Sequence, residues 1–225
     1  MSSVGFRIRS SFERPDKALV GAFRGIPVAN IADCMNRIAC VDSCIYPMNS
    51  APLLGCAYTV KVTGGDNLMI HKALDLASPG DVIVVAGGGT LERAYSGELM
   101  VQYAISRGLA GLIVDGCMRD RDAIALLDFP VYCKGITPNG PFKNGPGEIG
   151  YPVSFAGQVI FPGDIVVGDG DGIVVIRPNE AAAIAEEACG VIVKEEQIIA
   201  DIKAGKGFSR PWMDKALNEK GCVVE

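Results

Sequence analysis

The chain has 225 residues, of which 49% are hydrophobic and 21% charged, so it can form a real core and is not a disordered chain. Its formal net charge is -5, and no run of Lys or Arg is dense enough for a nucleic-acid-binding surface. No apolar run reaches the length of a membrane span, and the first residues lack the apolar core of a signal peptide.

Cysteine and histidine usage narrows the class of protein further. The eight cysteines are scattered and none forms a CxxC pair, which favours reduced thiols in the cytoplasm over a disulfide framework. The single histidine, His71, argues against a His-rich zinc site within one chain. We therefore expect a cytoplasmic protein with no nucleic-acid or membrane partner.

Hydrophobic periodicity predicts helices and then a βαβ unit in the first half of the chain. The expected elements, in order, are helices over 15–24 and 28–38, a strand over 56–63, a helix over 68–77, a strand over 82–85, a helix over 97–107 and a strand over 111–114. Asp66 or Asn67 can cap the helix over 68–77, and Gly108 ends the helix over 97–107. The two strands that flank this last helix should be parallel.

The second half of the chain is predicted to turn from helix to β structure. A short helix begins near Arg119 and ends before Pro130, and residues 137–150 form a Gly- and Pro-rich loop. The remaining expected elements are strands over 131–134, 152–155, 158–161, 164–167 and 172–176, and an amphipathic helix over 180–204. We expect one α/β domain over 1–225, with a tail over about 205–225 that docks on a neighbouring subunit.

One short sequence occurs twice. Pro79-Gly80-Asp81 and Pro162-Gly163-Asp164 each precede a run of Val and Ile. Two similar turns that lead into buried strands explain this echo better than an internal repeat does.

Polar residues gather in the loops that follow the two strands of the βαβ unit. These loops span 86–99 and 115–120, and both leave the carboxyl ends of their strands, where open α/β sheets bind ligands. We expect the carboxylates of Glu98 and Asp120 to reach one crevice, with the amide of Leu99 at a helix start. The alternative is that Arg119-Asp120 is only a helix cap and that the glycines only form a turn.

The chemistry of these residues favours a metal site that binds a small acid. Two carboxylates and water suit a hard cation such as Mg²⁺ or Mn²⁺. Arg119 can hold a substrate carboxylate by a two-point fork, and free amides at a helix N-terminus also favour anions. A 2-oxo acid would chelate the metal, which would then stabilise the enolate formed when a bond at C3 breaks.

The order of these residues resembles that of the RraA-like family, which includes the 4-hydroxy-4-methyl-2-oxoglutarate and 4-carboxy-4-hydroxy-2-oxoadipate aldolases. The family pattern is an acidic residue, twenty intervening residues, and Arg-Asp, which here corresponds to Glu98 followed by Arg119-Asp120. The segments 64–68, 115–120 and 163–169 are also similar to segments of the family. The resemblance extends over about residues 25–200.

The resemblance implies a swivelling β/β/α fold and a homo-oligomer, a trimer or a hexamer, with its active site between subunits. It implies that Asp120 is the direct ligand of Mg²⁺ or Mn²⁺ and that Arg119 binds the pyruvyl part of the substrate. Gly97 and the amide of Leu99 would contact the same carboxylate, and Glu98 would lie beside the metal's waters. Glu195 or Glu196 of a neighbour would complete the site; exposed helix positions are the alternative for both.

The chain departs from the family pattern at two positions. Glu98 stands where the family usually has Asp, so its carboxylate should act from a shifted position. Asp122 lies one place away from a further acidic position of the aldolase-type members, where this chain has Ala123. These departures leave the identity of the substrate open.

Other polar residues have simpler explanations than catalysis. His71 is expected to be a packed or surface histidine, and Asp169 with Asp171 is expected to form a tight hairpin turn rather than a calcium loop. Cys117 lacks a base partner, so we do not expect a nucleophile. Asp33 lines the pocket in one interpretation and is an exposed helix carboxylate in the other.

The expected function is cleavage of a 4-hydroxy-2-oxo acid to pyruvate and a second oxo acid, with oxaloacetate decarboxylation as a side reaction. The alternative is a non-catalytic regulator that binds an RNA-degrading endonuclease, as some members of the resembled family do. A methyltransferase is not favoured, because the sequence has no glycine-rich loop typical of S-adenosylmethionine binding.

Overall fold

The computed structural model of the chain describes residues 3–223. These residues divide into two compact units, 1–188 and 189–225, of which the first contains the whole β structure. The expectation of a single domain over 1–225 stays a prediction. No helix among the described residues is long and apolar enough to cross a membrane.

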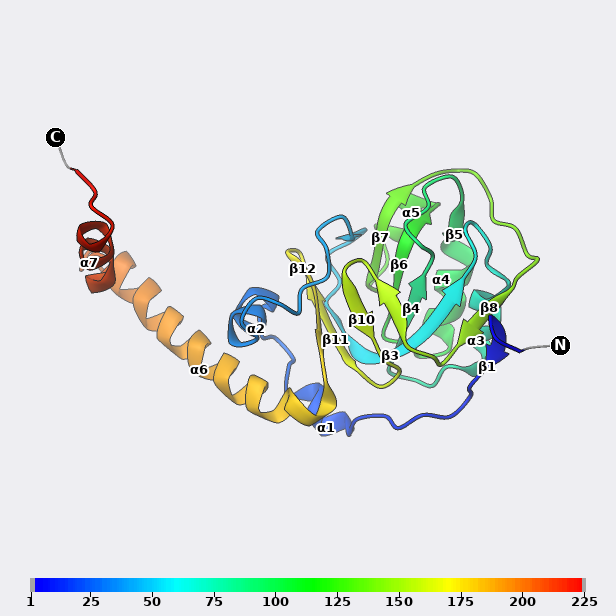
Figure 1. Ribbon diagram of the computed structural model, residues 1–225, viewed down its shortest axis with the longest axis horizontal. Coiled ribbons are helices and arrows are strands. Elements are labelled where there is room, and N and C mark those ends of the chain that lie inside the picture. Colours follow the sequence, from blue (N-terminus) through cyan, green and yellow to red (C-terminus); the bar gives the residue numbers. More distant parts are fainter. Residues whose placement is uncertain (1–2, 224–225) are drawn as a thin grey trace. The chain divides into compact units, whose positions relative to one another are not determined.

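A ten-stranded mixed sheet forms the centre of the first unit (Figure 1). Its main path runs in the order β1-β8-β3-β4-β6-β7-β2, while β11 and β12 extend from β3, and β5 pairs with β6. The strands are β1 (Phe6–Ile8), β2 (Tyr46–Pro47), β3 (Leu53–Val62), β4 (Asp81–Ala86), β5 (Ala94–Ser96), β6 (Gly111–Met118), β7 (Val131–Ile136), β8 (Gly147–Ile149), β11 (Ile165–Asp169) and β12 (Gly172–Ile176). A separate hairpin consists of β9 (Val153–Phe155) and β10 (Gln158–Ile160).

Four neighbouring strands, β3, β4, β6 and β7, are parallel and carry the connections that build the site. Every residue of β4 and β6 is buried, as expected for strands that are covered on both faces. Successive side chains point to opposite faces, so Ile83 and Val85 join one core while Val82 and Val84 join another. This alternation produces two apolar layers around one sheet.

Helices cover one of these faces and β structure covers the other. The first layer contains side chains of α3 (Leu68–Leu76) and α4 (Glu98–Ser106), and the second contains side chains of the β9–β10 hairpin and of β12. The arrangement is therefore β on β on α, in agreement with the predicted fold class. The remaining helices of this unit are α1 (Lys17–Gly21), α2 (Val28–Cys34), α5 (Arg121–Ile124) and the first part of α6 (Pro178–Lys203).

The second unit is helical and consists of the later part of α6 and of α7 (Pro211–Glu219). None of the residues of α7 is buried. Several large apolar side chains of this unit are exposed: Val193, Ile198, Ile199, Ile202, Phe208, Trp212 and Leu217. The tail over 205–225 thus contains a helix that the sequence analysis did not predict.

Most predicted elements are present, but several boundaries were wrong and the short strands β1, β2, β5 and β8 were not predicted. The loop predicted over 115–120 is strand up to Met118, because Cys117 and Met118 pair with Gly135 and Ile136 of β7. The predicted loops 86–99 and 137–150 contain the short strands β5 and β8. The helix predicted over 28–38 ends at Cys34, since two residues that follow it have positive φ.

Candidate functional site

A cavity of about 310 Å³ opens where the β6–α5 turn, the start of α4 and the loop after β7 meet. Its volume lies at the low end of the range of about 300–1,000 Å³ that is usual for ligand pockets, so it suits a small molecule. The residues that line it are Asn67, His71, Ser96, Gly97, Leu99, Met100, Arg119, Gly140, Pro141 and Lys143. None of these lining residues is acidic.

The Arg119-Asp120 pair forms a sharp turn directly after β6. Asp120 has left-handed backbone angles, φ 58° and ψ 39°, which L-residues other than Asn and Asp rarely adopt. The amide of Arg119 donates to the carbonyl of Ser96 at 3.1 Å, which holds this turn against the end of β5. The arginine Nε lies 3.6 Å from Asp120 Oδ2, so the pair is loose.

The carboxylate of Asp120 is bonded through one oxygen only. Its Oδ2 accepts a hydrogen bond from the backbone N–H of Glu98 at 2.9 Å. Within residues 3–223 no donor reaches Oδ1, and the side chain is 42% exposed. One carboxylate oxygen therefore remains available to a ligand.

Gly97 permits this close approach between the turn and α4. A Cβ at position 97 would lie 2.9 Å from Arg119 Cγ and 3.0 Å from its Nε, and it would overlap Asp120 Oδ2. Any larger residue would push the side chains of Arg119 and Asp120 away. Close approach of the backbone, rather than an unusual φ, thus requires glycine here.

The first turn of α4 presents a free donor beside the pocket. The N–H of Glu98 is taken by Asp120, but the N–H of Leu99 meets no acceptor among the described residues. The unpaired amides of a helix N-terminus carry partial positive charge. This amide and the guanidinium of Arg119 both favour an anion at the same end of the cavity.

Two buried polar atoms of residues that line the cavity have no hydrogen-bond partner among the described residues. The amide nitrogen of Asn67 donates to the carbonyl of Tyr95 at 3.1 Å, which fixes the orientation of this amide and leaves its Oδ1 without a donor. The hydroxyl of Ser96 is also unpaired, and both residues are 3% exposed. Unpaired buried polar atoms are rare and mark places where a bound molecule or water completes the structure.

The structure brings most of the predicted site residues together. Arg119, Leu99 and Gly97 line the cavity, whereas Asp120 and Glu98 lie beside it and are joined by their hydrogen bond. Glu195 and Glu196 are exposed on α6 in the second unit, in agreement with the simpler interpretation. Their participation in a neighbour's site stays a prediction.

The other residues that the sequence analysis considered have clear positions. Asp33 is exposed and paired with Arg37 at 2.8 Å, outside the cavity. Asp169 and Asp171 form the turn between β11 and β12, as expected. Burial raises the pKa of the Cys117 thiol, so it is a poor nucleophile.

His71 lies on the wall of the cavity, which the sequence analysis did not favour. Burial lowers the pKa of its imidazole, and the neighbouring charge of Lys143 lowers it further, so the ring is neutral near pH 7. Ser96 and Lys143 were not singled out, and Asn67 was considered only as a helix cap. Segments 66–71 and 139–145 reach the site only through the tertiary structure.

The family model described as "RraA-like: Aldolase/RraA" matches residues 28–175. The chain belongs to the RraA-like family. It is 41% identical, over 74% of its length and 80% of the relative, to a Halalkalibacterium halodurans protein named "Putative 4-hydroxy-4-methyl-2-oxoglutarate aldolase". Relatives of this chain are named as an aldolase and as an inhibitor of RNA processing, so membership of the family alone does not decide between these two functions.

Two solved structures share the fold. Streptomyces coelicolor RraAS2, titled an unusual member of the RNase ES inhibitor RraA protein family, superposes with a TM-score of 0.75 at 28% identity and covers 83% of this chain and 98% of its own. The RNA-processing inhibitor RraA from a Thermus species superposes with a TM-score of 0.62 at 25% identity and covers 67% of this chain and 92% of its own. Both confirm the predicted fold class.

Proposed function

We propose that the chain is a divalent-metal-dependent aldolase that cleaves a 4-hydroxy-2-oxo acid to pyruvate and a second oxo acid. The observation that carries this proposal is the convergence of Arg119 and the free N–H of Leu99 on one cavity, beside the half-bonded carboxylate of Asp120. The name of the 41% identical relative supports the same reaction class.

Arg119 and Leu99 would hold the carboxylate of the pyruvyl part. A guanidinium can donate two parallel hydrogen bonds to a carboxylate, and the amide of Leu99 adds a third donor from the helix terminus. Gly97 keeps these groups close to each other because it has no side chain between them. The acid would therefore bind in one orientation, with its keto oxygen toward Asp120.

The donors near Asp120 fit a hydrated Mg²⁺ or Mn²⁺ ion. The carboxylate has one unbonded oxygen, and Mg²⁺ commonly takes one or two protein carboxylates and fills its remaining positions with water and substrate. No group of three His, Cys, Asp or Glu residues in the described part of the chain could enclose an ion, so a tetrahedral zinc cage is not the model we adopt. Asp120 would be the direct ligand, with Glu98 beside the waters.

Cleavage of the C3–C4 bond leaves an electron pair on C3, which is delocalised onto the keto oxygen. When bound, the metal supplies positive charge that stabilises this oxygen. Arg119 fixes the carboxylate, and Glu98 would orient the water through which the C4 hydroxyl proton leaves and C3 is reprotonated. Oxaloacetate would lose carbon dioxide with the same electron pair left on C3, which explains the expected side reaction.

An assay of pyruvate release tests this proposal. Purified protein with Mg²⁺ or Mn²⁺ is expected to release pyruvate from 4-hydroxy-4-methyl-2-oxoglutarate and from oxaloacetate, and to lose both activities with a chelator. Arg119→Lys should also lose most activity, because lysine cannot form the two-point fork. Absence of metal-dependent turnover of both acids would contradict the proposal.

A second function is favoured by the solved relatives named as inhibitors of RNA processing. In this alternative the chain binds an RNA-degrading endonuclease through its outer surface and needs no catalysis. The two functions separate experimentally, since Asp120→Asn should abolish pyruvate release and leave any inhibition of the endonuclease intact.

We further propose a cytoplasmic homo-oligomer, a trimer or a hexamer, in which a neighbour covers the site. Leu99, which lines the cavity, is 83% exposed and Leu126 is 88% exposed, so both side chains are accessible to a subunit that packs over the site. Glu195 or Glu196 of the neighbour would then complete the site. Light scattering should give the oligomer mass, and Glu195→Gln mixed with Asp120→Asn should recover part of the activity through hybrid sites.

A further inference from the structure

The loop above the cavity is fixed by one buried carboxylate. Asp66, 3% exposed, accepts hydrogen bonds from three backbone N–H groups: those of Leu68 at 2.9 Å, Asn144 at 2.5 Å and Gly145 at 3.0 Å. The first belongs to the start of α3, and the other two belong to the loop after β7. A buried carboxylate is costly unless it is fully bonded, so this arrangement holds the loop on the helix.

Further contacts hold the loop on the other side of Lys143. The N–H of Phe142 donates to the carbonyl of Gly65 at 2.8 Å, and the N–H of Asn67 donates to the carbonyl of Phe142 at 3.0 Å. The guanidinium of Arg93 lies 3.9 Å from the centre of the Phe142 ring. The backbone is thus tied immediately before and immediately after Lys143.

The side chain presented by this loop is a cation with no acidic partner among residues 3–223. Lys143 lines the cavity together with His71 and Arg119, and the lining contains no carboxylate. Its charge helps to keep His71 neutral, and a neutral imidazole can still donate one hydrogen bond. The cavity therefore has two separate cationic groups, although one carboxylate needs only the Arg119 end.

We propose that Lys143 determines specificity by binding a second carboxylate of the substrate, and that Asp66 is the positioning residue that places Lys143. The inference rests on the proposed function, because it assumes that the first carboxylate lies on Arg119. His71 would add a hydrogen bond to the second carboxylate. A substrate without this group would bind and react at Arg119 with lower affinity.

Binding measurements with two matched acids test the inference without any turnover. 2-Oxoglutarate and 2-oxopentanoate have the same chain length and differ only in the carboxylate at C5. Calorimetry in the presence of Mg²⁺ should show that the native protein binds 2-oxoglutarate about ten- to a hundredfold more tightly. Lys143→Gln should remove this preference and leave the affinity for 2-oxopentanoate unchanged.

Matched variants separate recognition from folding. Lys72→Gln removes an exposed lysine of α3 that lies outside this cavity, and it should keep the preference. Lys143→Arg should retain part of it, and Asp66→Ala should lose it while 2-oxopentanoate still binds. Equal affinity of the native protein for both acids, or an equal loss for both acids in Lys143→Gln, would overturn the inference.

Kinetic measurements distinguish a failure of this inference from a failure of the proposed function. If the native protein does not release pyruvate from any 2-oxo acid, the aldolase proposal fails while the binding preference still decides the role of Lys143. If it is active, Lys143→Gln should raise KM for 4-hydroxy-4-methyl-2-oxoglutarate about tenfold or more and change kcat little. For 4-hydroxy-2-oxopentanoate, which lacks the second carboxylate, neither constant should change.

Discussion

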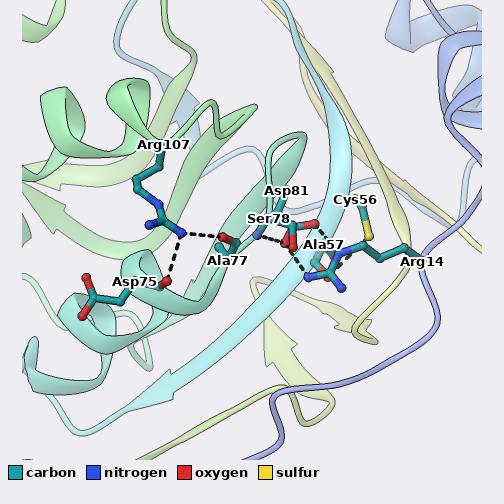
Figure 2. A network of polar contacts seen from close by, with 8 residues as sticks. All are labelled: Arg14, Cys56, Ala57, Asp75, Ala77, Ser78, Asp81 and Arg107. Carbon is teal, nitrogen blue, oxygen red and sulfur yellow. Dashed lines mark hydrogen bonds and ion pairs between the residues drawn. The ribbon is translucent and has the colours of Figure 1, made fainter.

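Two kinds of Arg–Asp pair lie at opposite ends of the parallel strands. At the amino end of β4, Arg14 donates to both oxygens of Asp81, at 2.9 and 2.7 Å, and the N–H of Ser78 donates to the same carboxylate at 2.8 Å (Figure 2). Asp81 is 1% exposed. At the carboxyl end of β6, the side chains of Arg119 and Asp120 are half-exposed, and Arg119 Nε is 3.6 Å from Asp120 Oδ2, too far for a hydrogen bond.

The second Pro-Gly-Asp turn repeats the bonded arrangement. Asp164 accepts from the N–H of Phe161 at 2.7 Å and is paired with Arg177, whose guanidinium lies 4.1 Å from the Phe161 ring centre. Arg14 lies over Phe12 in the same way, at 4.2 Å. Two similar turns, as the sequence analysis preferred, explain the echo. A fully bonded pair stabilises the fold, whereas a pair with free bonding capacity is suited to binding a ligand.

The largest difference between the two kinds of pair should appear in activity. Asp120→Asn keeps an acceptor for the N–H of Glu98 and tolerates the left-handed backbone, but it removes the charge. We expect pyruvate release to fall about a thousandfold, with the melting temperature nearly unchanged. A variant that melts much earlier would show that Asp120 belongs with the structural aspartates.

The next largest effect on activity should come from disturbing the close packing around Gly97. Gly97→Ala places a methyl group against Arg119 and Asp120, so we expect kcat/KM to fall about a hundredfold while the fold is retained. Steady-state kinetics with circular dichroism of the same sample measures both properties. Gly190→Ala, where a Cβ meets nothing within 4 Å, is the matched control, and an equal loss there would refute the packing argument.

Breaking the Arg14–Asp81 pair should reduce the stability of the protein rather than its activity. Arg14→Ala leaves Asp81 buried without its cation, and we expect the free energy of unfolding to fall by about 3 kcal/mol. Urea unfolding monitored by fluorescence measures this change. Arg37→Ala breaks the exposed pair with Asp33 and should cost less than about 0.5 kcal/mol. If the folded Arg14→Ala variant lost its catalytic turnover, the proposed difference between the Arg14–Asp81 pair and the Arg119–Asp120 pair would be contradicted.

The smallest effect should come from Glu148 on β8, between β1 and β3. Burial favours a higher pKa for its carboxyl, but the N–H of Gly5 and the guanidinium of Arg7 outweigh burial and leave the pKa below its usual value of 4.5. Because the pKa is lower in the folded state, the ionised carboxylate stabilises the protein above pH 4.5. This contribution is lost as the pH falls through the folded-state pKa. Glu148→Gln should therefore reduce acid sensitivity below pH 4.5, and an unchanged acid transition would contradict this assignment.

The sequence was sufficient to predict one half of the site but not the other. Glu98, Leu99 and Arg119-Asp120 follow two strands of a single βαβ unit, and local periodicity is enough to place them together. Asn67 and Lys143 reach the cavity only because distant segments pack, with the loop after β7 held on Asp66. The short strands β5 and β8 were missed for the same reason, since three residues carry little periodicity of their own.

Direct measurement of Mn²⁺ binding tests the central claim, that Asp120 is the metal ligand of this site. Electron paramagnetic resonance of Mn²⁺ in the presence of pyruvate should show a bound ion with the native protein and with Asp33→Asn, and almost none with Asp120→Asn. Equal Mn²⁺ binding by native protein and folded Asp120→Asn would contradict the account.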